Sequence, residues 1–134
     1  MIEDKNNNHS SIKDNSRYKS GLLGEKIALK EMEKLGFEFV CFRYKTKEGE
    51  IDLIVEDKKQ KLLVFVEVKR RKAIYDYENV ISKNQWNRIY NSAEIFLLEN
   101  EEKYKDYNIR YDAFICFNNT SNTIHIENVL QIDN

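Results

Sequence analysis

The chain has 134 residues, of which 41% are hydrophobic and 34% are charged, and its formal net charge is −1. This length suits one domain, and the hydrophobic fraction can build a modest core. No apolar run is long enough to cross a bilayer, so we expect no membrane partner. The near-zero net charge argues against a general nucleic-acid binder that acts through bulk positive charge.

The first residues differ in composition from the rest of the chain. Residues 1–19 are rich in Asn and Ser, carry charges of both signs and contain no apolar segment. This composition predicts a disordered tail and lacks the features of a secretory signal peptide. We therefore expect a cytoplasmic protein with a single folded domain over residues 20–130. Cys41 and Cys116 fit this compartment as buried free thiols.

A helix is predicted over residues 20–36. One of its faces carries apolar side chains at the helical period, namely Leu22, Ala28, Leu29, Met32 and Leu35. Glu25 falls inside this apolar stripe. The helix dipole favours a negative charge near the N-terminus, but it does not explain a carboxylate on the packing face. Glu25 is therefore a candidate functional residue.

Strand-like and helix-like patterns follow along the rest of the chain. Strands are expected over residues 37–46, 50–56, 61–69, 109–117 and, as a short edge strand, 123–127. A second helix is expected from about Ser82, a suitable N-cap, to Glu99. The order α-β-β-β-α-β predicts an α/β fold in which a mixed sheet is flanked by helices.

Two of the expected strands carry acids where core residues would be expected. Asp52 lies in the second strand, and Glu67 and Lys69 end the apolar third strand. Because side chains alternate between faces, Glu67 and Lys69 share a face, and a hairpin would bring Asp52 to them. Buried carboxylates are costly without a partner, and a shared Mg²⁺ would offset that cost. This combination is suited to metal-dependent attack on a phosphodiester.

The same alternation also fits an ordinary half-exposed strand. Glu67 and Lys69 would then be solvated or paired with residues across the strands. Taken alone, a Glu-x-Lys pattern favours this surface interpretation. The acidic strand at hairpin distance makes the two interpretations equally plausible, and both stay open on the pattern alone.

Three blocks taken together resemble the YraN family. They are Gly24-Glu25-x-x-Ala28, residues 49–54 (Gly-Glu-Ile-Asp-Leu-Ile) and residues 65–69 (Phe-Val-Glu-Val-Lys). Members are small bacterial proteins, mostly uncharacterised, and are similar in fold to the PD-(D/E)XK nuclease superfamily of restriction enzymes and archaeal Holliday junction resolvases. The resemblance covers about residues 18–129. It implies a restriction-endonuclease-like fold and a metal-dependent endonuclease, in a superfamily that also contains inactive members.

The resemblance also implies roles for individual residues. Four catalytic residues are implied: Glu25, Asp52, Glu67 and Lys69. The three acids would bind Mg²⁺ or Mn²⁺, and DNA or RNA would be the partner. Arg110 and Asp112, in a later block that resembles the family's Arg-Phe-Asp, would have a structural or supporting role around the site.

Basic and polar residues near these blocks are candidates for nucleic-acid binding: Arg43, Lys45, Arg70, Arg71, Lys83 and Gln85. The cationic run over residues 69–72 either contacts phosphates or is ordinary solvated charge, and we weigh the two equally. This chain departs from the family's usual Asn-x-Arg at residues 43–45 and from its usual lysine at Gln85, although polar groups remain at both places.

Two functions therefore remain open. One is a metal-dependent endonuclease, and the other is a catalytically inactive nuclease-fold protein that binds structured DNA or RNA or a protein partner. The sequence does not fix the oligomeric state, and a homodimer is compatible with either function.

Overall fold

The structure is a computed structural model that describes residues 15–72, 81–117 and 122–129. Its elements, in chain order, are α2 (Asn15–Lys34), β1 (Glu38–Thr46), β2 (Gly49–Asp57), β3 (Leu62–Arg71), α3 (Lys83–Glu99), α4 (Glu101–Tyr104), β4 (Asn108–Phe117) and β5 (Thr123–Ile126). Residues 1–14 of the predicted tail lie outside the described part. The helix itself begins at Asn15 rather than at the predicted Ser20.

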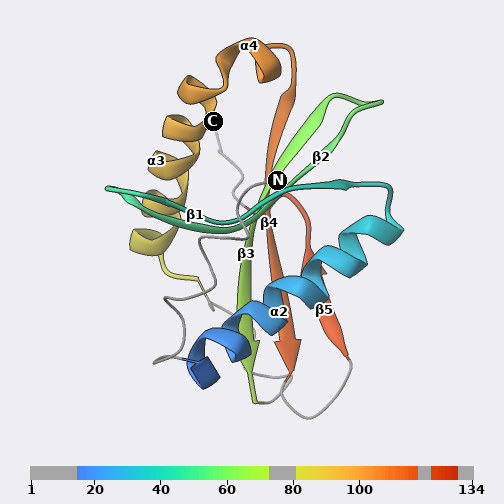
Figure 1. The fold of residues 1–134 in the computed structure, drawn as a ribbon, viewed down its shortest axis with the longest axis vertical. Helices are drawn as coiled ribbons and strands as arrows, with labels where there is room; N and C mark the ends of the chain where they lie inside the picture. The colour runs from blue at the N-terminus through green and yellow to red at the C-terminus, as the bar shows by residue number, and fades with distance from the viewer. Residues whose placement is uncertain (1–14, 73–80, 118–121, 130–134) are drawn as a thin grey trace.

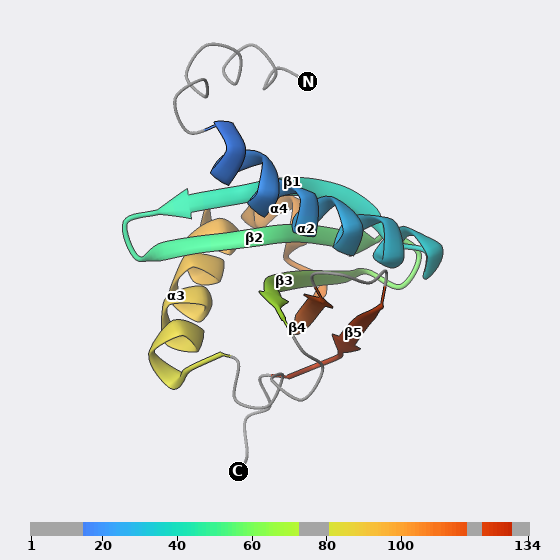
Figure 2. The same ribbon diagram turned by 90° about the horizontal axis from the view of Figure 1, so that it is seen from below.

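The strands form one mixed sheet in the order β1-β2-β3-β4-β5 (Figure 1). Among the strands of the described residues, β3 and β4 pair in parallel, and the other neighbouring pairs are antiparallel. Helices α2 and α3 lie on opposite sides of the sheet (Figure 2). The predicted mixed sheet flanked by helices is therefore confirmed, and the architecture is consistent with a restriction-endonuclease-like fold.

Both faces of β3 are buried over residues 63–67, which explains its uninterrupted apolar run. On the α2 side, Val64 and Val66 pack with Ala28 and Met32. On the α3 side, Leu63 and Phe65 belong to a cluster that also contains Ile89, Ala93 and Phe96. Each large side chain buried in this way stabilises the fold by roughly 1.5–3 kcal/mol relative to exposure. A carboxylate in β3 therefore lies in the interior beside these apolar side chains.

The end of α2 differs from the prediction. Gly36 adopts a φ of +99°, the N–H of Gly36 donates to the carbonyl of Glu33, and the N–H of Phe37 donates to the carbonyl of Met32. These bonds form the glycine-terminated stop that is common at helix ends. Leu35 lies beyond Lys34, the last helical residue, and is 55% exposed, so its predicted place on the packing face was wrong.

The second half of the chain follows the prediction closely. Ser82 caps α3, because its Oγ accepts the N–H of Gln85 at 3.1 Å. The short helix α4 was not predicted; its Tyr104 is buried against Phe96. Strand β5 pairs with β4 at the sheet edge, as expected. None of the helices in the described ranges combines the length and apolar character needed to span a bilayer.

The β1–β2 hairpin is distorted at Arg43, in addition to a register shift between Phe39 and Cys41. Arg43 has a φ of +51°, which is uncommon for a residue other than glycine. The register pairs Phe42 with Leu53 and Tyr44 with Ile51, which places Arg43 opposite Asp52. Strict alternation would put Ile51 on the same face as Leu53. Instead, Leu53 packs on the α2 side and Ile51 on the α3 side, so the two strands change faces at the position of Asp52.

Candidate active site

Asp52 lies where β2 and β3 separate. Their backbone pairing extends from Asp57 with Leu62 only as far as Leu53 with Val66. Beyond this pair the Oδ2 atom of Asp52 accepts the backbone N–H of Val68 at 2.8 Å. A side-chain carboxylate thus takes the place of a strand carbonyl, and this bond fixes Asp52 beside β3.

Glu67 lies in β3 and points toward α3. Only 5% of the residue is exposed, so it leaves bulk water as the sequence predicted. Its Oε2 atom accepts a hydrogen bond from Nε2 of Gln85 at 2.8 Å and lies 3.2 Å from Nζ of Lys69. The carboxylate is therefore held both by its own strand and by the first turn of α3.

The two acids open onto one cavity of about 220 Å³. Its lining residues are Glu50, Asp52, Glu67, Gln85, Arg88 and Ile89. The cavity is thus formed by β2, β3 and α3, with acids on the strands and with polar groups and Arg88 on the helix. The structure brings Asp52 and Glu67 together here, and Lys69 joins them through its ion pair with Glu67.

Glu25 approaches this region from α2, on the other side of the sheet. It is buried, and its Oε1 atom accepts from Nε of Arg43 at 3.0 Å. Burial and the nearby charge of Asp52 raise the pKa of Glu25 to about 7, against the opposing effect of Arg43. Glu25 is therefore electrostatically coupled to Asp52, although it does not line the cavity.

The pKa values of Asp52 and Glu67 are raised. Burial first, and then the negative charge of Asp52, raises the pKa of Glu67 to about 8. Burial also raises the pKa of Asp52, although the hydrogen bond from Val68 opposes this shift. Neighbouring carboxylates in a poorly solvated place disfavour each other's ionised form. A site of this kind has a high affinity for positive charge, either a proton or a cation.

The donor set can be compared with the needs of a divalent metal ion. Within the described ranges, no three His, Cys, Asp or Glu side chains are arranged to hold a metal ion together. Arg43 engages Glu25, and of the three predicted metal-binding acids Asp52 and Glu67 line the cavity, beside Glu50. Mg²⁺ is usually held by one or two carboxylates, several waters and substrate phosphate oxygens. The pair formed by Asp52 and Glu67 fits that requirement.

Two predicted nucleic-acid contacts turn toward acids instead of solvent. Gln85 donates to Glu67, and Arg43 pairs with Glu25. Both residues lie beside predicted catalytic acids.

The other predicted contacts lie outside the lining of the 220 Å³ cavity. Lys83 is exposed at the start of α3, and Lys45 is exposed on β1 beside a second hollow of about 480 Å³ between the hairpin and α3. Arg70 and Arg71 are partly exposed at the end of β3, where Nη1 of Arg71 donates to the carbonyl of Arg70 at 2.9 Å.

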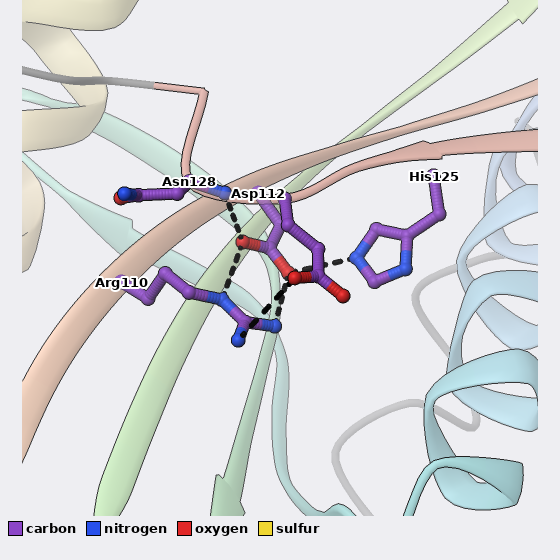
Figure 3. A network of polar contacts seen from close by, with 5 residues as sticks. Arg110, Asp112, His125 and Asn128 are labelled. Carbon is purple, nitrogen blue, oxygen red and sulfur yellow. Dashed lines mark hydrogen bonds and ion pairs between the residues drawn. The ribbon is translucent and has the colours of Figure 1, made fainter.

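Arg110 and Asp112 belong to a separate network, shown in Figure 3. Asp112 is fully buried, and Arg110 donates to both of its carboxylate oxygens at 2.9 and 2.8 Å. Nε2 of His125 lies 2.8 Å from Oδ2 of Asp112, and the N–H of Asn128 donates to Oδ1 at 2.9 Å. Burial alone would raise the pKa of Asp112, but the hydrogen bonds from His125, Arg110 and Asn128 outweigh it and hold the pKa below its ordinary value.

This network lies on the opposite face of the sheet from Glu67. Asp112 is in register with Val66, which packs on the α2 side, whereas Glu67 points to the α3 side. Of the structural and supporting roles implied by the resemblance, the observed contacts are structural, since they join β4 to β5 and the turn after it.

Comparison with known proteins identifies the family of this chain. The profile of Uncharacterised protein family UPF0102 matches residues 24–116. This chain belongs to the UPF0102 family. A UPF0102 protein of Nitrobacter winogradskyi is 31% identical over 98 residues, which cover 73% of this chain and 80% of that protein. A UPF0102 protein of Rhodopseudomonas palustris strain CGA009 is 33% identical over 104 residues, which cover 78% of each.

The UPF0102 match confirms the resemblance to the YraN family. The matched range contains all four predicted catalytic residues: Glu25, Asp52, Glu67 and Lys69. It ends at Cys116, so it contains Arg110 and Asp112 but not their partners His125 and Asn128.

Two residues that line the cavity of this UPF0102 protein were not singled out from the sequence. Arg88 follows Gln85 by one helical turn, and residues at that spacing share a helix face. Glu50 precedes Asp52 by two positions in β2. The helical spacing was a usable signal for Arg88, but only once Gln85 was known to face the acids.

Proposed function

We propose that this UPF0102 protein is a metal-dependent nuclease that hydrolyses phosphodiester bonds in DNA or RNA. One observation carries the proposal: Asp52 and Glu67, from two different strands, line the same cavity, and Lys69 lies 3.2 Å from Glu67. Perturbed carboxylates in a cavity are typical of functional sites, because a purely structural interior avoids crowding acids.

Each residue has a role in this proposal. Asp52 and Glu67 would hold Mg²⁺ or Mn²⁺ through one or both carboxylates. When bound, such an ion polarises a phosphate oxygen and lowers the pKa of its bound water. Lys69 is 21% exposed at its side chain, so its ammonium can donate to an attacking water or to a phosphate oxygen that gains charge.

The surroundings of the cavity support a polyanionic substrate. Arg88 lines the cavity, and exposed Lys83 begins the same helix. Lys45 lies beside the second hollow between the hairpin and α3. Cations around an acidic centre can hold the substrate backbone by charge while the acids hold the metal. The formal net charge of −1 is then compatible with a polyanionic substrate, because acids gather in the cavity and cations lie near it.

One observation favours a second candidate function. Arg43 and Lys69 already pair with Glu25 and Glu67, which neutralises part of the acidic charge without a metal ion. In this alternative, the protein binds structured nucleic acid or a protein partner through the nuclease fold and does not hydrolyse it. We place it second, because Asp52 and Glu67 still meet in a cavity.

A cleavage assay with a matched control separates the two functions. Wild type, Asp52→Asn and the exposed control Asp106→Asn are incubated with linear and branched DNA and RNA, in Mg²⁺, in Mn²⁺ or with chelator. The proposal expects cleavage by wild type and by the control only with metal, and none by Asp52→Asn. Binding of the panel by all three proteins, with no cleavage in any metal, would establish the second function instead.

A further inference from the structure

Gln85 is held in place by the start of α3. Its backbone N–H donates to Oγ of the N-cap Ser82 at 3.1 Å, and the N–H of Trp86 donates to the carbonyl of Ser82 at 3.0 Å. The N-cap residue satisfies backbone donors that the first helical turn would otherwise leave open. The cap therefore fixes the backbone from which the Gln85 side chain extends toward β3.

The side chain of Gln85 ends on a single carboxylate oxygen. Its Nε2 atom donates to Oε2 of Glu67 at 2.8 Å, and Nζ of Lys69 approaches the same Oε2 atom at 3.2 Å. The two donors come from different elements, α3 and β3. The two contacts restrict the rotation of the Glu67 carboxylate, which shares the cavity with Asp52.

We propose that Gln85 is a positioning residue for Glu67 rather than a contact for nucleic acid. By holding Oε2, it fixes the orientation of the Glu67 carboxylate in the cavity that Asp52 also lines, where the two acids can share a divalent cation. This inference rests on the proposed function. Hydrogen bonds to ligating carboxylates orient them and tune their affinity for the metal.

The chemistry of the amide suits this task. A primary amide donates a hydrogen bond but carries no net charge. It therefore fixes the Glu67 carboxylate without adding a second cation beside the ammonium of Lys69.

Gln85→Ala tests the inference with two independent readouts, and Asn87→Ala, an exposed amide in the same turn of α3, is the matched control. Calorimetric titration with Mn²⁺ alone should show affinity weakened ~10- to 100-fold in Gln85→Ala, as for other residues that support a metal ligand, and unchanged in Asn87→Ala. In steady-state cleavage at fixed metal, kcat should fall while KM for nucleic acid stays within about twofold of wild type, because the mutation does not remove a substrate contact.

The outcomes distinguish this inference from the proposed function. Wild type that neither binds Mn²⁺ nor cleaves overturns both. Wild type that does both, with Gln85→Ala equal to it in Mn²⁺ affinity, overturns the inference alone. A raised KM with unchanged Mn²⁺ affinity would also overturn it, because Gln85 would then be a substrate contact.

A measurement on wild type alone covers the case in which Gln85→Ala does not fold. The side-chain amide signals of Gln85 and Asn87 are followed by nitrogen-detected NMR while Mg²⁺ is added. The Gln85 signal should move with the metal titration and the Asn87 signal should stay. If the Gln85 signal is as unresponsive as that of Asn87 while the metal binds, Gln85 does not support the metal-binding carboxylate.

Discussion

Asp52 and Val68 meet across the opening between β2 and β3, where Oδ2 of Asp52 accepts the Val68 N–H at 2.8 Å. This bond replaces a backbone hydrogen bond between the two strands and holds the Asp52 side chain beside β3. The distortion at Arg43, opposite Asp52, accompanies the change of faces in the hairpin. Uncommon backbone conformations of this kind cluster at functional sites, where the surrounding structure maintains them.

Lys69 is expected to act on chemistry rather than on binding. Lys69→Ala should lower the turnover by on the order of 10²-fold, as for the loss of one preorganised charge that stabilises a transition state. Substrate affinity should change little. Single-turnover kinetics beside equilibrium binding separates the two effects, with exposed Lys105→Ala as control. A variant that loses affinity but keeps its turnover would make Lys69 a phosphate clamp.

Arg88 should show the opposite behaviour. It lines the cavity from α3, so Arg88→Ala should weaken binding of nucleic acid and reduce the slope of log affinity against log salt by roughly 1, the effect of one lost phosphate contact. Binding measured at several salt concentrations gives the slope. An unchanged slope would remove Arg88 from the substrate interface.

Gly49 tests the close packing of α3 on the hairpin. A Cβ at this position would lie 3.0 Å from Cβ of Arg88 and 3.3 Å from its carbonyl oxygen. Gly49→Ala should therefore cost roughly 1–3 kcal/mol of unfolding free energy, as for other overpacked sites. Urea denaturation measures this cost, with Gly24→Ala as comparison, because its Cβ would meet ordinary contacts at 3.4 Å or more. Equal stability of Gly49→Ala and wild type would contradict the packing.

Asp112 should make stability depend on acid pH. Its pKa is held below the ordinary value of 3.8, so its contribution to stability is present above about pH 4 and is lost as the pH falls through the folded-state pKa. Asp112→Asn should be less stable by roughly 1–3 kcal/mol at pH 7, because charge-assisted hydrogen bonds from Arg110 and His125 are weakened. The difference from wild type should shrink below pH 4 in denaturant unfolding. A constant difference from pH 7 to 3 would show that the Asp112 charge is not what Arg110 and His125 stabilise.

The sequence predicted the elements well because their local signals agreed with the fold. The apolar run of β3 matched a strand buried on both faces, and Ser82 capped α3 as expected. Leu35 was misplaced because the stop at Gly36 ends the helix before the apolar stripe does. The spacing of apolar residues alone does not show where the helix ends.

The residues of the site were found more reliably than their contacts. Glu25, Asp52 and Glu67 stood out because acids interrupted apolar patterns. The contact from Gln85 to Glu67 depends on how α3 packs across β3, and the place of Asp112 on the α2 face depends on strand register. Neither relationship joins residues that are close in sequence. Residue type alone therefore suggested that Gln85 contacts phosphate and that Asp112 supports the acids of the site.

Thermal unfolding with added metal tests whether Asp52 and Glu67 form a preformed site for a divalent cation. A ligand that binds only the folded state stabilises it by mass action, by about 2.7 kcal/mol at a concentration one hundred times its Kd. We expect Mg²⁺ or Mn²⁺ to raise the Tm of wild type and of Asp106→Asn, and to leave the Tm of Asp52→Asn unmoved. If saturating metal moves wild type and Asp52→Asn equally, or moves neither, the two carboxylates do not form the site.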